Sequence, residues 1–443
     1  MNSDSGHNGV TRGSTERRPP WWSGMLKLLY PGMGVKRWLL VGAVGIAVTS
    51  IGVAFMLRKL LDLRFPNFLP SYAEGILLLV GGGLVILLGM YGLYRSIGPL
   101  ILASSSIDGL ADTIYTRRSR GRGTRIVAIG GGTGLSVLLR GLKAYTDNLT
   151  AIITVADDGG SSGRLRRELG VLPPGDFRNC LVAMSESEPL LAELFQYRFD
   201  QGDGLKGHSF GNLFIVAMTS VTESFQQALL ESSKVLAVQG QILPATLDNL
   251  NLSARLRDGR TVQGESSIVE HGSQIDELFI DPVSPEAYPP AVEAIQQADM
   301  IVIGPGSLFT SLLPSLLVPD IRRALDETAA LKVYVCNVAT QVGETDGYSV
   351  EDHVKTLQSY TFEGIADHTV ANTGVTGLGA EFMGEVVRSD GSPLPHAILK
   401  KADLIDPNHA VRHDSEKLAE AIISIHREGR RTGKARTKPA GRS

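Results

Sequence analysis

Short apolar segments alternate with helical segments from residue 124 onward, and this alternation limits the fold more than any other feature of the 443-residue chain. Residues 125–129, 151–156, 300–304 and 332–338 are nearly continuous apolar runs rich in β-branched side chains. Such runs are typical of parallel strands that are buried on both faces. Alternating strands and helices predict an α/β fold with a doubly wound, mainly parallel sheet. The expected helices cover residues 135–144, 176–185, 209–220, 224–237, 289–298, 320–329 and 351–360.

One segment interrupts this alternation. Residues 252–265 contain two short strand-like runs around Asp258-Gly259, a pair that is typical of tight hairpin turns. We expect an inserted β-hairpin at the rim of the sheet. A terminal helix near residues 415–428 would then close a domain that we place at residues 124–426.

Charge is distributed unevenly along the chain, although the formal net charge is only −3. Residues 1–123 hold 14 basic and 6 acidic side chains, residues 124–426 hold 22 and 39, and residues 427–443 hold 7 and 1. Affinity for nucleic acid comes largely from Lys and Arg that neutralise phosphates, so the acidic central domain predicts no nucleic-acid partner. The two cysteines, Cys180 and Cys336, are too few for a disulfide framework and suit a reducing compartment.

Two runs of 20 residues near the N-terminus contain no charged side chain. They span residues 38–57 and 75–94, and as helices each would reach about 30 Å, the hydrocarbon thickness of a bilayer. We therefore expect an α-helical transmembrane hairpin over residues 38–94, with two buried core helices as the alternative. Glycines would let the two helices approach closely; they stand at positions 42, 45, 81, 82, 83 and 89.

Basic residues flank this hairpin on both sides. The tendency of positive loops to stay inside predicts a two-pass protein of the inner cell membrane, with residues 124–443 in the cytoplasm. Residues 1–37 and 427–443 are expected to be disordered basic tails, and residues 95–123 a basic juxtamembrane linker.

The sequence GGGTG at residues 130–134 stands between a predicted strand and a predicted helix. Glycines let the backbone turn sharply, and they let its N–H groups face an anion at the positive end of the helix. A phosphate cradle is expected, with a purely structural turn as the alternative. The loop is not a dinucleotide fingerprint, because Leu135 and Val137 stand where that motif requires glycine, and it lacks the Gly-Lys pair of a P-loop. The residues expected to meet phosphate here are Gly131, Gly132, Thr133 and Gly134.

A second loop, residues 155–170, follows the next predicted strand. Asp157 and Asp158 end that strand at the ligand edge of the sheet, where they could meet a ribose hydroxyl or hold Mg²⁺. The residues expected to meet oxyanions in this loop are Gly160, Ser161, Ser162 and Arg164. We expect Arg166, Arg167 and Glu168 to lie on a solvated helix face.

Two short motifs come next. In residues 172–179, Asp176 can cap the following helix, and Arg178 in the first turn favours either a nearby anion or an acidic neighbour. In residues 207–213, His208 precedes a helix start and could be a general acid, a phosphate donor or a cap partner. The remaining ligand-binding candidates of these motifs are Asn179, Ser209 and Asn212, together with Asp176 itself.

A fourth loop, residues 304–319, again follows a predicted strand and begins with a rigid Gly-Pro-Gly-Ser turn. Gly306, Ser307 and Thr310 are expected to contact an anion or a sugar at the same sheet edge. Asn337, near the end of the next strand, would complete the wall of the crevice, whereas Cys336 alternates away from it into the core.

Taken in order, these motifs resemble the bacterial gluconeogenesis factor family (YvcK type), which belongs with 2-phospho-L-lactate transferase to a CofD-like group. The resemblance covers about residues 124–426, and residues 373–400 match less well. It implies a Rossmann-like cytoplasmic domain that binds UDP-sugars such as UDP-N-acetylglucosamine. It also implies a role in cell shape and peptidoglycan supply during growth on gluconeogenic carbon sources. The matching segments are GGGTGLSVLLRGLK, TVADDGGSSGRLRRELG, PPGDFRN, GHSFGNL, IGPGSLFTSLLPSLLVP and VCNVATQVGETDG.

Two classes of function follow. The preferred hypothesis is a regulatory nucleotide-sugar-binding protein whose glycine loops hold the diphosphate. The alternative is an enzyme resembling 2-phospho-L-lactate transferase, in which Asp157 and Asp158 hold Mg²⁺ while Arg178 and His208 stabilise charge on the transferred group. A dehydrogenase ranks third because the dinucleotide fingerprint is absent. A homo-oligomer is possible in each case.

Overall fold

The computed structural model divides by its internal contacts into residues 1–119 and residues 120–443, and each unit is taken by itself below. The structure describes residues 35–60, 79–92, 120–121, 123–186, 189–271, 274–374, 382 and 384–431. The predicted N-terminal tail lies outside these residues except for its last three, which already belong to a helix. Most of the predicted linker 95–123 lies outside them as well.

The N-terminal unit contains the helix α2 (Val35–Leu60), which includes the predicted segment 38–57, and helical residues 79–92, which lie within the predicted segment 75–94. The two helices touch at glycines. A Cβ atom added to Gly45 would stand 2.8 Å from Ile86, and one added to Gly82 would stand 2.3 Å from Thr49. Close approach at glycine is therefore confirmed for these two positions.

Among the helices in the described ranges, none has both the length and the apolar character needed to cross a membrane. The predicted transmembrane hairpin thus finds no support in the structure.

The second unit is built around a seven-stranded sheet with the strand order β10-β9-β8-β7-β1-β2-β3. Each neighbouring pair is parallel, as predicted. The strands are β1 (Ile126–Gly130), β2 (Leu149–Ile153), β3 (Gln241–Pro244), β7 (Met300–Ile303), β8 (Leu331–Val335), β9 (His368–Asn372) and β10 (Ile398–Ala402).

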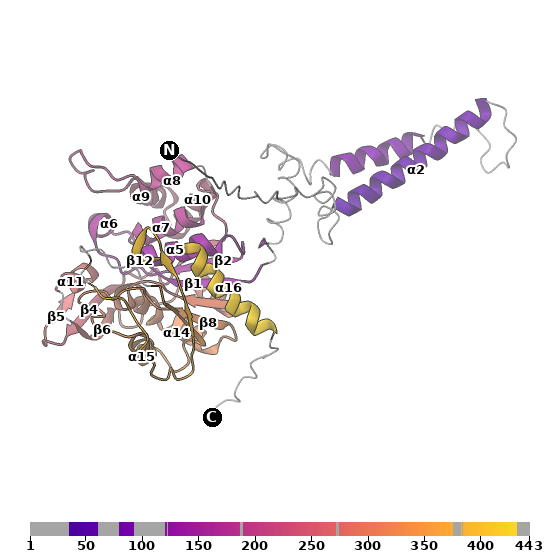
Figure 1. Ribbon diagram of the computed structural model, residues 1–443. Coiled ribbons are helices and arrows are strands. Elements are labelled where there is room, and N and C mark those ends of the chain that lie inside the picture. The colour runs from indigo at the N-terminus through magenta and orange to yellow at the C-terminus, as the bar shows by residue number, and fades with distance from the viewer. Residues whose placement is uncertain are drawn as a thin grey trace, which may run out of the picture. The chain divides into compact units, whose positions relative to one another are not determined.

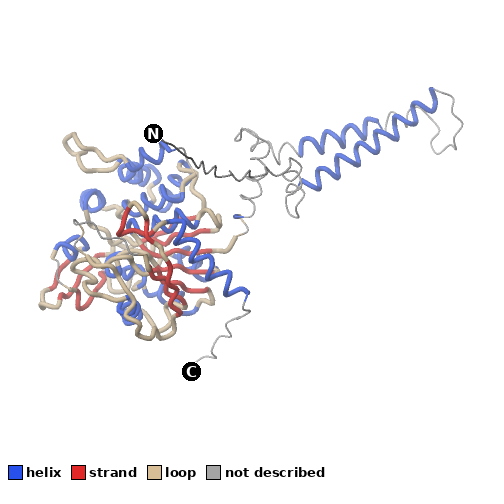
Figure 2. The backbone as a smooth tube through the Cα atoms, in the orientation of Figure 1, coloured by secondary structure: helices blue, strands red, loops and turns tan. Residues whose placement is uncertain are grey.

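Helices cover both faces of the sheet, so the doubly wound prediction is confirmed (Figures 1 and 2). One face carries α5 (Gly132–Leu142), α7 (Gly175–Met184) and α16 (Ser415–Arg431). The other face carries α12 (Pro289–Gln297), α14 (Pro319–Glu327) and α15 (Val350–Tyr360). Right-handed crossovers require this division, because the chain moves from β1 to β3 in one direction and from β7 to β9 in the other.

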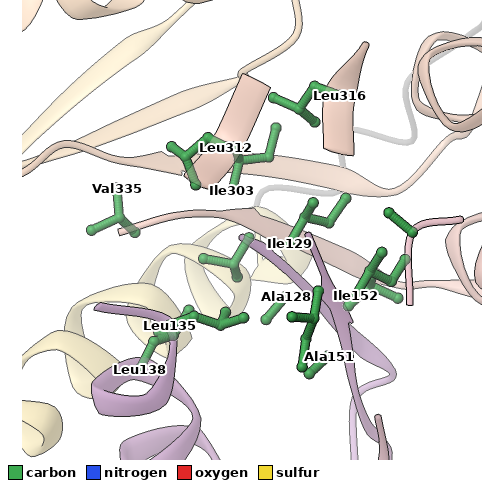
Figure 3. Packing of buried hydrophobic residues seen from close by; sticks show 14 of the residues in the cluster. Ala128, Ile129, Leu135, Leu138, Ala151, Ile152, Ile303, Leu312, Leu316 and Val335 are labelled. Atoms are coloured by element: carbon green, nitrogen blue, oxygen red, sulfur yellow. The ribbon is translucent and has the colours of Figure 1, made fainter. Parts of the chain in front are cut away.

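The core lies on both sides of the strands (Figure 3). Leu135 of α5 approaches β1 from one side, and Leu312 approaches it from the other. Both leucines and Ile129 of β1 are fully buried. Each such side chain contributes about 1.5–3 kcal/mol by leaving water, which explains why the strands read as continuous apolar runs.

The predicted insertion is confirmed and is larger than expected. β4 (Asn251–Leu256) and β5 (Thr261–Gln263) form the hairpin, with Gly259 at φ +85° in its turn. The sequence prediction missed a third antiparallel strand, β6 (Ile275–Asp281), and the short helix α11 (Glu265–Glu270) between them.

Several boundaries differ from the predicted ones. α5 begins at Gly132, three residues early, so the glycine loop supplies the first helical turn. β2 ends at Ile153, so Asp157 and Asp158 stand beyond the strand. α16 continues to Arg431, into the segment predicted to be a disordered tail.

Further helices are α6 (Gly160–Leu169), α8 (Pro189–Gln196), α9 (Phe210–Thr222) and α10 (Phe225–Val235), and a small antiparallel pair is formed by β11 (Ile405–Asp406) and β12 (His409–His413).

Candidate functional site

β1 and β7 are neighbours in the sheet, but the chain leaves them in opposite directions. β1 leads through α5 to β2, and β7 leads through α14 to β8 on the opposite face. The connections diverge at the carboxyl ends of the two strands, which is where open α/β sheets bind ligands. A cavity of about 430 Å³ lies at this switch point.

The glycine loop after β1 forms one wall of the cavity. Residues 131–134 line it, and α5 begins there with Gly131 as its N-cap, which has no side chain to cap the helix. The Asp176 carboxylate bonds the Gly132 N–H, and no side chain among the described residues caps the rest of the turn. The first N–H groups of an α-helix have no partner within the helix, and they carry the positive end of its dipole. This wall is therefore suited to an anion.

The loop after β7 forms the facing wall and touches the first. A Cβ atom added to Gly134 would stand 2.5 Å from the Pro305 carbonyl oxygen. Gly306, Ser307 and Thr310 line the cavity from this side. Ser307 Oγ accepts a hydrogen bond from the Thr310 backbone N–H at 3.1 Å, which caps the π-helical turn η1 (Leu308–Leu312).

Asn337, after β8, also lines the cavity and fixes this second loop. Its Nδ2 donates to the Gly306 carbonyl oxygen at 2.8 Å, and its Oδ1 accepts from the Gly306 N–H at 3.1 Å. Cys336 is fully buried, as predicted. In all, eight predicted residues line the cavity: Gly131, Gly132, Thr133, Gly134, Gly306, Ser307, Thr310 and Asn337.

Two glutamates that the sequence prediction missed also line the cavity. Glu344 is only 2 % exposed and accepts a short hydrogen bond from Ser307 Oγ. Burial raises the pKa of Glu344 above its usual value. Glu265, the first residue of α11, has its pKa raised to about 9 by burial and by the neighbouring carboxylates of Asp157 and Asp176. Glu344 stands in the segment VCNVATQVGETDG, residues 335–347. No pattern in the sequence brings Glu265 to the cavity.

The C-terminal pair β11–β12 supplies a further part of the wall that was not predicted. Val411, Arg412 and His413 of β12 line the cavity. Arg412 is exposed, whereas His413 is only 6 % exposed. Sequence patterns gave no signal for them, because a two-stranded pair so late in the chain cannot be assigned to an edge of the sheet.

The other predicted residues gather beside the cavity rather than in its lining. Ser161 Oγ lies 2.9 Å from His208 Nδ1, and Asn212 Nδ2 donates to the same Oγ at 3.1 Å. All three side chains are buried. Burial, and next the charge of Arg164, lower the pKa of His208.

Arg178 belongs to the same cluster. It is buried, and it donates to Ser209 Oγ and to Asn179 Oδ1. Its Nε atom has no hydrogen-bond partner among the described residues. Burial lowers the pKa of Arg178, and the nearby charge of Arg198 lowers it further. Of the two partners expected for this arginine, a direct acidic pair is absent from the contacts of the described chain.

Three aspartates connect this cluster to the cavity. Asp157 Oδ1 accepts from the Gly159 N–H at 2.9 Å, and Asp158 Oδ1 accepts from both the N–H and the hydroxyl of Ser266. Asp176 was predicted to cap α7; this is wrong, because no side chain caps that helix. Instead it bonds the backbone of Gly132, and its pKa is raised to about 6, first by burial and then by Asp157.

These contacts bear on the predicted Mg²⁺ site. Asp157 and Asp158 each already use one carboxylate oxygen within the protein. Over the residues that the structure describes, no group of three or more His, Cys, Asp or Glu side chains is arranged to hold a metal ion. Because Mg²⁺ is usually held by one or two carboxylates together with water and substrate phosphates, the predicted Mg²⁺ site stays a prediction.

The prediction for Arg166 is wrong. Instead of lying on a solvated helix face, Arg166 is 7 % exposed and connects α6 to the segment before β4. Its guanidinium donates to Asn249 Oδ1 at 2.7 Å, to the Leu250 carbonyl oxygen at 2.6 Å and to Asn251 Oδ1 at 2.8 Å. Arg164 also bonds within the protein, donating to the Lys206 carbonyl oxygen at 3.0 Å.

The fold and the cleft together define a doubly wound α/β protein with a ligand cavity at the switch point of its sheet. Residues 126–428 match the family described as 2-phospho-L-lactate transferase CofD. The chain belongs to this family and, within it, to the gluconeogenesis factors.

The relatives support this assignment. The gluconeogenesis factor of Bacillus subtilis is 44% identical over 318 residues, which cover 70% of this chain and 100% of that relative. That of Halalkalibacterium halodurans is 48% identical over 307 residues, or 67% of this chain and 95% of that relative. A Nostoc relative is 44% identical over 442 residues, covering 93% of this chain and 94% of its own.

A solved structure gives the same result for the fold. The crystal structure of a UPF0052 family protein from Bacillus halodurans is 46% identical and superposes with a TM-score of 0.65. It covers 68% of this chain and 99% of that chain.

Proposed function

We propose that this protein binds a UDP-sugar of the UDP-N-acetylglucosamine type at the switch-point cavity and acts as a regulatory binder. The observation that carries the proposal is that the glycine loops after β1 and β7 touch and line one cavity at the start of α5. A cavity of about 430 Å³ falls within the range of roughly 300–1,000 Å³ that is usual for small-ligand sites.

In this proposal, the N–H groups of Thr133 and Gly134 hold the diphosphate and Arg412 adds positive charge. Glu265 and Glu344 would repel phosphate as carboxylates. Burial and neighbouring carboxylates raise the pKa of Glu265 to about 9, so this group favours the neutral form, which can donate a hydrogen bond to a sugar or a base. Glu344 already accepts a hydrogen bond from Ser307 Oγ.

The regulatory part of the proposal concerns cell shape and peptidoglycan supply during growth on gluconeogenic carbon sources. Relatives that align with two thirds or more of this chain carry the name gluconeogenesis factor. A nucleotide-linked amino sugar is a suitable signal for such a role, because it reports the supply of wall precursor directly.

The binding proposal is tested by calorimetric titration of the purified full-length chain with UDP-N-acetylglucosamine, UDP-glucose and UDP. We expect saturable binding that is tightest for the amino sugar, and no hydrolysis of the ligand. ADP-glucose serves as the matched ligand control for the base. Absence of heat with every uridine ligand would contradict the proposal.

Phosphoryl or phospholactyl transfer is a second candidate, and the description of the matching family favours it. Here the buried cluster of Arg178 and His208, next to Asp157, would stabilise charge on the transferred group. Phosphorus magnetic resonance during incubation with diphosphate-linked donors tests it. Turnover that is lost in Asp157→Asn, with unfolding unchanged, would place this candidate above the binder.

Membrane attachment through residues 38–94 is also a proposal. Its support is the pair of charge-free runs and the exposed apolar side chains on their helices, among them Leu40, Ile46 and Leu87. Carbonate extraction of cell membranes tests it. We expect the full chain in the pellet and a chain starting at residue 120 in the supernatant; equal recovery of both in the supernatant would refute it.

A further inference from the structure

The helix α11, which belongs to the inserted strands β4–β6, forms one wall of the switch-point cavity. Glu265 and Val269 both line the cavity, and they stand one helical turn apart on the same face of α11. Both keep accessible surface, because Val269 is 45 % exposed and Glu265 is only half-buried. This face of α11 is therefore turned toward the cavity, where a ligand would meet one carboxyl group and one apolar side chain.

Asp158 fixes the start of this helix. Its Oδ1 accepts from the Ser266 N–H at 2.9 Å and from the Ser266 hydroxyl at 2.8 Å. A Cβ atom added to Gly264 would clash with Asp158 Oδ2, so the backbone passes this carboxylate at a distance that only glycine allows. Both chain neighbours of Glu265 thus touch one carboxylate. The Gly264 N–H also donates to the Leu252 carbonyl oxygen of β4 at 2.8 Å, which ties the helix to the insertion.

The Glu265 carboxyl has no hydrogen-bond or ion-pair partner among the residues that the structure describes. The charged groups that act on it are all acidic: Asp157, Asp158, Asp176 and Glu344. Burial and these carboxylates raise its pKa to about 9, so the group carries a proton at neutral pH. A protonated carboxyl donates a hydrogen bond and brings no positive charge for phosphate, so it suits an uncharged acceptor.

We propose that α11 is a specificity wall of the cavity, where Glu265 donates a hydrogen bond to a carbonyl oxygen of the ligand and Asp158 positions it. This inference rests on the proposed UDP-sugar binding. Two parts of such a ligand carry carbonyl oxygens, the uracil ring and the acetamido group of the amino sugar. Val269 adds an apolar surface beside the donor, which suits a ring or a methyl group. The glycine loops take the diphosphate, and α11 selects an uncharged part of the ligand.

The test compares Glu265→Leu, which removes the hydrogen-bonding group, with Glu265→Gln, whose amide still donates. We measure the dissociation constants of UDP-N-acetylglucosamine, UDP-glucose and UDP for the full-length chain, together with ADP and pyrophosphate, neither of which has a carbonyl group. Glu265→Leu is expected to weaken the ligand that carries the contacted carbonyl roughly tenfold and to leave ADP and pyrophosphate unchanged. Glu265→Gln is expected to stay within about threefold of wild type.

The ligand series separates the two sources of the carbonyl. A loss shared by all three uridine ligands assigns the contact to the uracil ring. A loss confined to UDP-N-acetylglucosamine assigns it to the acetamido group. Both results support the inference.

Glu270→Leu is the matched control, because Glu270 is exposed at the last position of α11 and does not line the cavity. The same substitution at this position should leave every dissociation constant unchanged. Thermal unfolding of the ligand-free variants shows whether each one folds.

A double-mutant cycle tests the positioning role of Asp158. Asp158→Ala releases Ser266, and it should weaken UDP-N-acetylglucosamine binding in the wild-type background but add little in Glu265→Leu, where the positioned group is gone. Ser266→Ala removes only the hydroxyl bond and repeats the cycle if Asp158→Ala does not fold. Equal losses in both backgrounds would show that Asp158 does not act through Glu265, and would overturn its positioning role.

The failure of this inference is distinguishable from that of the proposed function. If the wild-type protein binds none of the uridine ligands, the proposed function fails. If it binds them and Glu265→Leu binds every ligand as tightly as wild type, only this inference is overturned. A loss that extends to ADP or pyrophosphate indicates a general distortion of the cavity or a contact outside the carbonyl, and it also overturns the inference. So does a loss in Glu265→Gln as large as that in Glu265→Leu, because it shows that an ionised carboxylate is needed.

Discussion

Asn337 bonds both backbone groups of Gly306, donating to its carbonyl oxygen at 2.8 Å and accepting from its N–H at 3.1 Å. The end of β8 thereby holds the loop after β7 in the conformation that faces the glycine loop. The loop that lines the cavity is thus held by a side chain that follows the next strand as well as by its own Ser307 cap.

Replacement of Asn337 tests this arrangement. Asn337→Ala removes two side-chain-to-backbone hydrogen bonds and should lower the free energy of unfolding by roughly 1–3 kcal/mol. It should also weaken UDP-N-acetylglucosamine binding by a larger factor than its effect on stability explains. Urea unfolding and calorimetric titration measure the two effects.

Asn372 is the matched control for that variant. It makes the same pair of bonds to Gly374, at 3.0 and 2.9 Å, at the end of β9 and outside the lining of the switch-point cavity. Asn372→Ala should lose at least as much stability, because its Oδ1 also accepts from the Leu404 N–H at 3.0 Å, and should retain ligand affinity. If both variants bind equally well, the Gly306 loop does not contribute to binding.

Gly134 tests the contact between the two loops. In Gly134→Ala, the new methyl group would stand 2.5 Å from the Pro305 carbonyl oxygen, so the loops must separate. We expect weaker ligand binding and a lower melting temperature, although alanine favours the helix by about 1 kcal/mol. Gly429→Ala in α16 meets no atom within 4 Å and should raise the melting temperature slightly. A Gly134→Ala variant that binds and melts like wild type would contradict the contact.

Replacement of Arg166 tests whether this side chain is buried between α6 and the segment before β4, rather than lying on a solvated helix face. Arg166→Leu removes three hydrogen bonds and leaves one buried acceptor, the Leu250 carbonyl oxygen, without its donor, and we expect a loss of roughly 1–3 kcal/mol in the free energy of unfolding. Arg167→Leu removes only an exposed bond to the Asp158 carbonyl oxygen and should cost much less. Chemical unfolding of the two variants measures the difference. Equal losses of stability in the two variants would contradict the buried position of Arg166 and favour the solvated helix face that the sequence predicts.

Glu265 makes stability depend on pH. Its pKa is raised from 4.5 to about 9, so between these values the folded protein holds a proton that the unfolded chain releases. Raising the pH therefore favours unfolding, and this contribution to stability is greatest near pH 4.5 and is lost progressively toward pH 9. Asp176, with a pKa of about 6, adds a loss in the same direction between about pH 4 and 6.

Glu265→Gln should remove most of this dependence and raise the free energy of unfolding at pH 8 by roughly 1–3 kcal/mol. Urea unfolding at pH 5, 6.5 and 8 measures it. Glu270→Gln, at the exposed end of the same helix, is the control and should leave the profile unchanged. A wild-type protein that becomes more stable from pH 5 to pH 8 would contradict the assignment.

Much of the fold could be predicted because its strands are buried on both faces. Ile126–Gly130 and Met300–Ile303 are apolar throughout, and such runs have few other uses. Strand β6 was missed because only three of its seven residues, Ile275, Leu278 and Ile280, are buried, and acidic residues stand between them. The early start of α5 was missed because glycines at its first positions look like loop.

The candidate site was predicted in part. The glycine loops could be predicted because glycines that directly follow a strand indicate a tight turn from the local sequence alone. His413 and the acids Glu265 and Glu344 were not, because their position depends on packing between elements far apart in the chain. The burial of Arg166 was missed for the same reason: its partners stand more than eighty residues away.

The lining of the cavity runs from Gly131 to His413, almost the whole length of the second unit. During synthesis from the N-terminus, the glycine loop therefore leaves the ribosome long before β12 exists to complete the wall. A chain interrupted after β9 would retain the glycine turns yet present them to open water, so the wall of the cavity is complete only when translation is nearly finished.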